Sequence, residues 1–454
     1  MKKWISLLPA IILYSGVLVG CEAQTSDSPS AAEQPAIIIV DSEAVPDYSA
    51  PPEVVVPDGD AEVLIFAHYY DPDNTEDSYA VNFKKITDQF IAETGVQVEV
   101  EVVPWNQLDA KLIITNQAGE PGADLFYCSS HKMASFVHAG ALLPLDDYFA
   151  HEDINDYNPL AIRAVTFPGD GKMYQALASI HSRGLWYNTD LMPVPPKTMD
   201  EMITIGQQVV KEHPDKYAFG FFANNHYGSI EVTVGPFIWA MGGKIVNIDG
   251  TAAWDTPQVA EAIKFLSDCV NVYKISPESV FLGEFSDIED AFLAGNVASI
   301  INGTYMISSF LKESELGQAG KLKFVPIPGN GGPAPNFSNG WAFGIPTLSR
   351  QPDLAWSYIS FFQRPEIQVQ HALFEGGMPT RMSSYDDPAF LDPPFPDFVE
   401  NMVANGHPMD PLIYYQEGLE AFNLVNIGFV LDPTQDLMQM LNDSAEEYNN
   451  RFFN

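Results

Sequence analysis

Basic residues are scarce in this chain of 454 residues, which has 22 Lys and Arg against 60 Asp and Glu and a formal charge of −38. Binding to nucleic acid depends on contacts of Lys and Arg to phosphates, so this balance argues against a nucleic-acid partner. It also disfavours anionic ligands, because no cluster of basic residues is visible along the sequence. We interpret the dispersed acids as a solvated acidic surface.

Cysteine is nearly absent, and only Cys128 and Cys269 lie outside the N-terminal segment. The sequence allows these two to pair, but we expect two free, buried thiols. The chain also lacks C-x-x-C, H-E-x-x-H, G-x-S-x-G, a phosphate loop and a dinucleotide fingerprint. We therefore predict no enzyme, no cofactor and no metal, although a pair of carboxylates for glycoside hydrolysis needs no local motif and stays open.

Two weaker patterns point to metals. The loop from Asp71 to Asp77 carries oxygen side chains at alternate positions, as a calcium loop does, but Glu76 replaces the turn glycine and Asn82 the bidentate glutamate. The doublets Tyr69-Tyr70 and Tyr414-Tyr415 could offer tyrosinates to iron. We interpret both doublets as packed or half-exposed side chains.

The one long apolar run lies at the N-terminus. Two lysines precede the run from Trp4 to Val17, and LVGC follows, ending at Cys21. This order resembles a bacterial lipobox, with an ordinary secretory signal or a membrane anchor as alternatives. We predict a signal peptide over 1–20, lipidation of Cys21, a Pro-rich acidic tether over 21–60, and a location outside the cytoplasm on the cell envelope.

The body opens with strands and helices in alternation, which predicts a parallel sheet with right-handed crossovers. The expected elements are a strand at Val63–Ala67, a helix from about Ser78 closed by Gly95, a strand at Val96–Val102, a helix after Trp105 and a strand at Asp124–Tyr127. Ligands of such sheets bind at the carboxyl ends of the strands. The loops that follow these three strands are therefore expected on one rim.

Many aromatic residues lie on that expected rim and in later segments of the chain. Sugar rings stack their apolar faces on aromatic rings, while their hydroxyls need polar partners. Core packing remains the alternative for any single ring. The set is Tyr70, Trp105, Tyr127, Trp186, Trp239, Tyr305, Trp341 and Tyr414.

Eight short segments, in order, resemble extracellular solute-binding protein family 1, which includes the maltose- and maltooligosaccharide-binding proteins of ABC importers. The most specific is HAGALLPLDDY at 138–148. The others are GEPGADLFY, LWYNTDL, PPKTMDEM, FIWAMGG, SIINGTY, GWAFGIP and EGGMPTR. The likeness covers about Val63 to Phe452.

The resemblance implies an α/β protein of the periplasmic-binding-protein fold (class II type), with two lobes, each a mostly parallel sheet flanked by helices, joined by a hinge. We place the N-terminal lobe at 61–175 with about 305–350. The C-terminal lobe is expected at 176–304 with about 351–454.

The resemblance also implies ligand-binding residues. Tyr70 and Asp71 lie on the loop after the first strand, Tyr127, Ser129 and His131 match an aromatic and an acid, and His181 aligns with a ligand-binding glutamate. Tyr305 matches the tryptophan of ING-x-W, and Tyr414 or Tyr415 falls near a C-terminal stacking ring. Trp239 and Trp341 are added from the rim. Arg183 and Arg381 are open to a binding or an ion-pair role.

These features imply a lipid-anchored, monomeric receptor that captures a neutral sugar or oligosaccharide and delivers it to the transmembrane subunits of an ABC permease. It would contact the membrane through the N-terminal lipid. Three alternatives stay open: the same fold binding a cation such as a polyamine, a surface glycoside hydrolase, and a sensory protein that reports a ligand without importing it.

The charge predicts a salt-dependent stability. Removal of residues 1–20 takes away two lysines and no acid, so the formal charge becomes −40. We hypothesise a saline habitat and expect the melting temperature to rise between low salt and about 1 M NaCl, because ions screen the repulsion among acids. A scanning-fluorimetry series in NaCl measures this, and a flat melting temperature would contradict it.

Overall fold

The computed structural model describes residues 63–120, 122–224, 227–281, 283, 285–391, 394–409 and 412–453. The predicted signal peptide, Cys21 and the tether lie outside these residues. All the described residues belong to one compact unit of the chain, residues 51–454. None of the described helices is long and apolar enough to cross a membrane.

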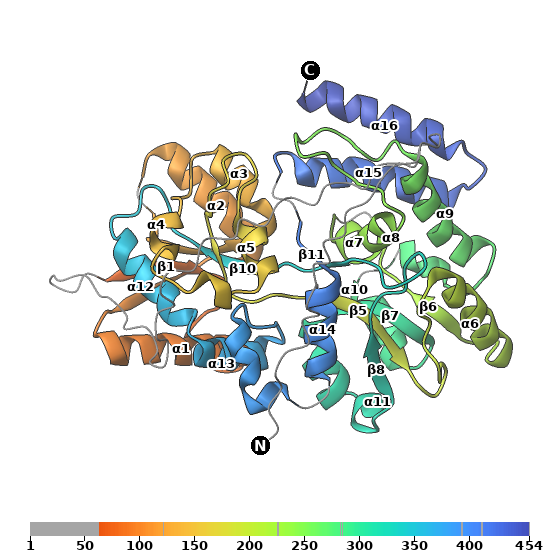
Figure 1. The fold of residues 1–454 in the computed structure, drawn as a ribbon, viewed down its shortest axis with the longest axis horizontal. Coiled ribbons are helices and arrows are strands. Elements are labelled where there is room, and N and C mark those ends of the chain that lie inside the picture. Colours follow the sequence, from red (N-terminus) through yellow and green to blue (C-terminus); the bar gives the residue numbers. More distant parts are fainter. Residues whose placement is uncertain are drawn as a thin grey trace, which may run out of the picture. The chain divides into compact units, whose positions relative to one another are not determined.

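A five-stranded sheet forms the first lobe (Figure 1). Its order is β2 (Val98–Val102), β1 (Leu64–His68), β3 (Leu125–Ser129), β10 (Trp341–Gly344) and β4 (Ala176–Leu177). The first three strands are parallel, as their alternation with helices predicts, while β10 runs antiparallel to both of its neighbours.

Helices cover both faces of this sheet (Figure 1). On one face α1 (Ser78–Thr94) packs with α12 (Pro352–Phe362) and α13 (Pro365–Glu375). On the other lie α2 (Trp105–Ala118), α3 (Met133–His138) and α5 (Pro159–Val165), and α4 (Asp146–Phe149) follows α3 in the chain.

Helix α1 forms where the sequence predicts it. Asp77 caps its start by accepting hydrogen bonds from the backbone N–H groups of Tyr79 and Ala80. Gly95 ends it with φ of 76°, a left-handed conformation that favours glycine. The apolar positions of α1 face a core cluster that it shares with β1, β3 and α12.

A four-stranded sheet forms the second lobe, in the order β6 (Tyr217–Gly220), β7 (Val297–Gly303), β5 (Arg183–Asn188) and β8 (Leu322–Val325). Strand β5 is antiparallel to β7 and β8, and β6 is parallel to β7, so this sheet is mixed instead of mostly parallel. Helix α6 (Met199–Glu212) packs on β6, α10 (Phe285–Leu293) on β7 and α14 (Phe395–Asn405) on β8.

Further helices complete the second lobe. Helix α9 (Pro257–Asn271) contacts α15 (Tyr415–Leu431) and α16 (Leu437–Phe452). A continuous helical stretch joins α7 (Tyr227–Ser229), a π-helical segment at Ile230–Val234 and α8 (Gly235–Ala240). Short α11 (Glu315–Gln318) precedes β8, and β9 (Asn336–Phe337) pairs with β11 (Gly406–His407).

Strand β5 begins directly after the chain passes from one sheet to the other. A Cβ at Gly184 would lie 2.1 Å from the ring of Phe324, so the pairing with β8 requires glycine there. The strand ends in an Asx turn, in which the side-chain oxygen of Asn188 accepts a hydrogen bond from the N–H of Asp190 at 3.0 Å.

The division of the chain between the lobes differs from the expected one in two places. Strand β8, expected in the first lobe, pairs with β5 in the second. Helices α12 and α13, expected in the second lobe, contact α1 in the first. The reason for the second difference is local packing, since the ring of Phe362 on α12 meets that of Phe343 on β10 at 4.7 Å.

Both cysteines of the body are buried free thiols, which confirms the expectation for them. Cys128 lies on β3 and Cys269 on α9, so the two belong to different lobes.

Phe90 offers a test of the first core. It is fully buried and makes edge-to-face contacts with Tyr358 and Phe361 at 5.1 and 5.5 Å. We expect Phe90→Ala to lower the free energy of unfolding by about 3–5 kcal/mol in urea titrations, because it opens a cavity. Ile114→Ala, at a side chain 62% exposed on α2, is the control and should change it by less than about 0.5 kcal/mol. Equal effects of the two substitutions would contradict this packing.

Candidate functional site

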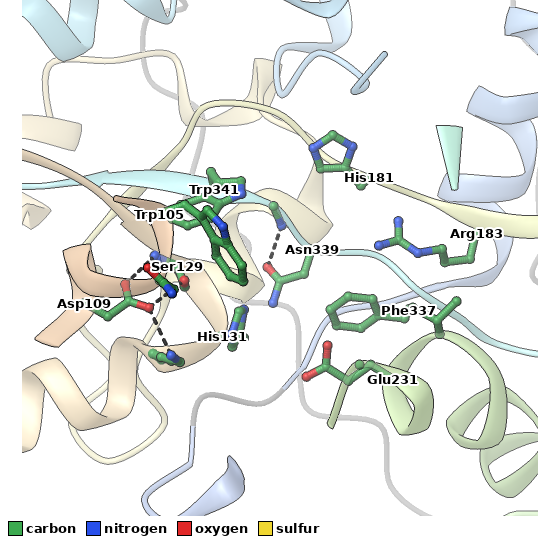
Figure 2. Close-up of a pocket in the computed structure, with 15 residues that line it drawn as sticks. Trp105, Asp109, Ser129, His131, His181, Arg183, Glu231, Phe337, Asn339 and Trp341 are labelled. Atoms are coloured by element: carbon green, nitrogen blue, oxygen red, sulfur yellow. Dashed lines mark hydrogen bonds and ion pairs between the residues drawn. The ribbon is translucent and has the colours of Figure 1, made fainter. Parts of the chain in front are cut away.

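One pocket of about 400 Å³ takes its walls from both lobes and from the segments that cross between them (Figure 2). The first lobe contributes Trp105, Asn106, Asp109, Ser129, His131, Lys132 and Trp341. The second lobe contributes Arg183, Gly228, Glu231 and Val232. The crossing segments contribute His181, Phe337, Asn339 and Gly340.

The first-lobe wall is built at the carboxyl end of β3. Ser129 ends the strand, and Asp109, one turn into α2, accepts hydrogen bonds from the N–H and hydroxyl of Ser129 at 3.1 and 2.9 Å. The ammonium of Lys132 lies 3.1 Å from the same carboxylate. Asp109 thereby fixes the turn that carries His131, whose pKa burial lowers to about 4, so this imidazole is neutral at pH 7.

Aromatic faces line this wall. Trp105, the first residue of α2, is 57% exposed. Trp341 begins β10 beside Ser129 and stacks on Tyr127, with ring centroids 5.6 Å apart and planes 8° apart. Tyr69 packs on Trp341 at 5.0 Å. Trp341 is therefore held rigidly from behind, while Trp105 has room to move.

The crossing segments are joined by backbone hydrogen bonds. The N–H of His181 donates to the carbonyl of Asn339 at 2.8 Å. The His181 ring lies 3.7 Å from the Glu375 carboxylate, which also accepts from Ser179 and lies 2.9 Å from His371. Burial alone would raise the pKa of Glu375, but the charges and hydrogen bonds of the two histidines hold it well below its usual value. Glu375 thus lies as a buried carboxylate beside His181.

Arg183 and Glu231 form the second-lobe wall. Both side chains are buried, and Figure 2 shows the guanidinium of Arg183 directed toward the middle of the pocket, with Glu231 and Phe337 beside it. Burial raises the pKa of Glu231 to about 8, although Arg183 and Lys132 act to lower it. The Glu231 carboxyl is therefore largely protonated at pH 7. Glu231 lies on the π-helical segment, a distortion frequent at functional sites.

The structure brings four of the sequence-predicted site residues to this pocket, namely Ser129, His131, His181 and Trp341. Two others lie directly behind it. Tyr127 is 1% exposed and supports Trp341, and Tyr305 contacts the guanidinium of Arg183 at 4.9 Å.

The remaining predicted residues lie elsewhere. Tyr70 stacks on Tyr79, and Asp71 is exposed in the loop after β1. Trp239 lies against His407 in a separate pocket of about 300 Å³. Tyr414 packs on Phe452 and Phe453 at the C-terminal helix. None of these side chains lines the pocket of Figure 2.

Several residues that line the pocket could not be predicted from the sequence, because they belong to no recognisable motif. Asp109 is one acid among 60, and Phe337 and Asn339 directly follow a Pro/Gly-rich stretch that carries no binding motif. Glu231 offered one usable sign, since it is a lone acid inside the apolar run IEVTV. Arg381, by contrast, is structural: it pairs with Glu152 and its guanidinium lies 4.1 Å over the ring of Tyr157.

Among the described residues, no three His, Cys, Asp or Glu side chains lie close enough together to hold a metal ion. Carboxylates in the pocket are also few: Asp109 is held by Ser129 and Lys132, and Glu231 is largely protonated. The arrangement suits binding by stacking and hydrogen bonds.

Comparison with known proteins finds relatives that are binding proteins. A binding protein of Brucella abortus is 26% identical over 65% of this chain and 72% of its own length. The maltotriose-binding protein of Pyrococcus abyssi is 24% identical over 69% of this chain and 66% of its own length.

Among solved structures, the sugar-binding protein MalE from Xanthomonas citri aligns with a TM-score of 0.74 and 18% identity, covering 85% of this chain and 96% of that one. This likeness confirms the two-lobed α/β fold. The family model for bacterial extracellular solute-binding proteins matches residues 85–395. The chain therefore belongs to the bacterial extracellular solute-binding protein family.

Proposed function

We propose that this protein captures a sugar or oligosaccharide between its two lobes and delivers it to an ABC permease. The observation that carries the proposal is a single pocket that takes lining side chains from both lobes. Its aromatic faces, Trp105, Trp341 and Phe337, suit the apolar faces of sugar rings, and its polar groups suit their hydroxyls. The maltotriose-binding and sugar-binding relatives support the same ligand class.

Capture follows from contact with both lobes at once. A ligand that touches Trp105 on one side and Arg183 on the other stabilises the arrangement in which both walls are close. We infer that the lobes exchange between open and closed states without ligand, and that the ligand shifts the population toward the closed state. No bond of the sugar is made or broken.

The pocket favours this function over two alternatives. A polyamine site needs several free carboxylates, but one of the two acids that line the pocket is paired with Lys132 and the other is largely protonated. A glycoside hydrolase needs two carboxylates that both reach the sugar, but the oxygens of Asp109 are occupied by Ser129 and Lys132, which leaves Glu231 alone. A sensory role without transport would use the same pocket and differ only in its partner.

Ligand binding is measured by calorimetry and thermal shift on the full-length protein in detergent, with oligosaccharides, polyamines and ferric iron. We expect a sugar to raise the melting temperature, and Trp105→Ala to weaken its binding by about 10- to 30-fold through loss of stacking. Trp356→Ala is the matched control, because Trp356 stacks on Tyr148 away from the pocket. Stabilisation by a polyamine alone would overturn the proposal.

The lipid anchor has its own test. The LVGC sequence supports lipidation of Cys21, and two or three acyl chains suffice for stable attachment. We expect Cys21→Ser to lose incorporation of labelled palmitate and to move from the membrane fraction to the supernatant. Cys128→Ser, at a buried thiol of the body, should keep both the label and the membrane fraction. Labelling of Cys21→Ser at the level of the unmodified protein would contradict the anchor.

A further inference from the structure

The pocket is lined by as many bases as acids, although acids outnumber bases 60 to 22 in the whole chain. Two acids and two bases line it, in addition to two histidines. Lys132 and Asp109 neutralise each other at 3.1 Å. The net charge of the pocket therefore depends on Arg183 and Glu231.

Arg183 is a buried cation that forms no ion pair with a carboxylate of the described residues, although Glu231 lies near enough to favour its charged form. The residue is 8% exposed, its Nε and Nη1 have no hydrogen-bond partner, and no carboxylate of the described residues forms an ion pair with it. A buried charge without a counter-charge is costly, and a binding partner of opposite sign removes that cost.

The position of this guanidinium is fixed by its surroundings. The rings of Tyr305 and Phe337 lie 4.9 and 5.5 Å from its central carbon. Its backbone is held on both sides, because Asn336 accepts from its N–H at 3.0 Å and Asn401 donates to its carbonyl at 2.9 Å. The Arg183 guanidinium is therefore held in position without a bound ligand.

The other unused groups of the pocket are mainly donors. Protonated Glu231 can donate its O–H, and its Oε1 has no partner. Asn339 uses its side-chain oxygen to accept from the N–H of Gly340 at 3.1 Å, while its Nδ2 has no partner. The acceptor oxygens of Asp109 are already occupied. A group that only accepts hydrogen bonds matches this set better than a hydroxyl does.

We propose that the sugar bound here carries a negatively charged group, a ring carboxylate as in a uronic acid or a sulfate ester, which Arg183 binds. This inference rests on the proposed function and replaces the neutral sugar that the sequence led us to expect. Guanidinium binds carboxylate and sulfate through paired, charge-assisted hydrogen bonds. The acidic surface does not prevent an anionic sugar from reaching Arg183, because exposed charges are screened beyond about 8 Å at physiological ionic strength.

The experiment compares ligands that differ only in charge. Calorimetry on the full-length protein in detergent uses a galacturonic acid trimer, the matching galactose trimer and a sulfated galactose trimer. We expect at least one anionic trimer to bind about tenfold or more tightly than the neutral one, and the stronger of the two identifies the charged group. A neutral trimer that binds equally or more tightly overturns the inference and leaves the proposed function intact. If none of the three trimers binds and no other sugar raises the melting temperature, the inference and the proposed function are both overturned.

A variant assigns the effect to Arg183. We expect Arg183→Gln to reduce the affinity for the anionic trimer about 30-fold or more and to bring the ratio of anionic to neutral affinity close to one. Damage to the fold would lower both affinities and keep their ratio. Arg350→Gln removes the same charge at an exposed position and should preserve the ratio. An unchanged ratio in Arg183→Gln overturns the assignment.

Discussion

The hydrogen bonds between the crossing segments are the constraint on which the site depends. Ile180 exchanges backbone hydrogen bonds with Met378 at 2.8 and 2.7 Å, and the next residue, His181, donates to Asn339. Buried backbone groups must be paired, so these short bridges hold together the three places where the chain passes between the sheets. His181, Arg183, Phe337 and Asn339 all lie within or beside them, and they reach the pocket for that reason.

The two walls of the pocket are supported in different ways. The first-lobe wall is a hydrogen-bonded turn, in which Asp109 holds Ser129 and Lys132. The second-lobe wall contains groups that lack partners, because the guanidinium of Arg183 rests on aromatic rings and Glu231 is desolvated. A ligand would therefore gain little from the first wall's ionic groups and much from the unpaired groups of the second.

The sequence was most informative where a signal is local. The helix at Ser78–Thr94 followed from its terminal Gly95, a signal that acts within a few residues, and the structure adds the Asp77 cap at its start. The parallel arrangement of β1, β2 and β3 followed from the alternation of strands and helices. The rim argument, which needs only strand direction, placed Trp105 and the turn after β3 near one another, but the loop of Tyr70 and Asp71, which it placed on the same rim, does not line the pocket.

By itself, the sequence determined the acidic charge and the alternation of strands and helices, and its resemblance to the solute-binding family implied the two-lobed α/β class. That both thiols are free was an expectation, and the structure decided it by placing Cys128 and Cys269 in different lobes. Tertiary structure alone decided which aromatic residues share a pocket and that Arg183 is unpaired while Arg381 pairs with Glu152. The physical reason is distance along the chain: Trp105, Arg183, Glu231 and Asn339 meet only through sheet pairing and lobe packing, and no local pattern encodes such contacts.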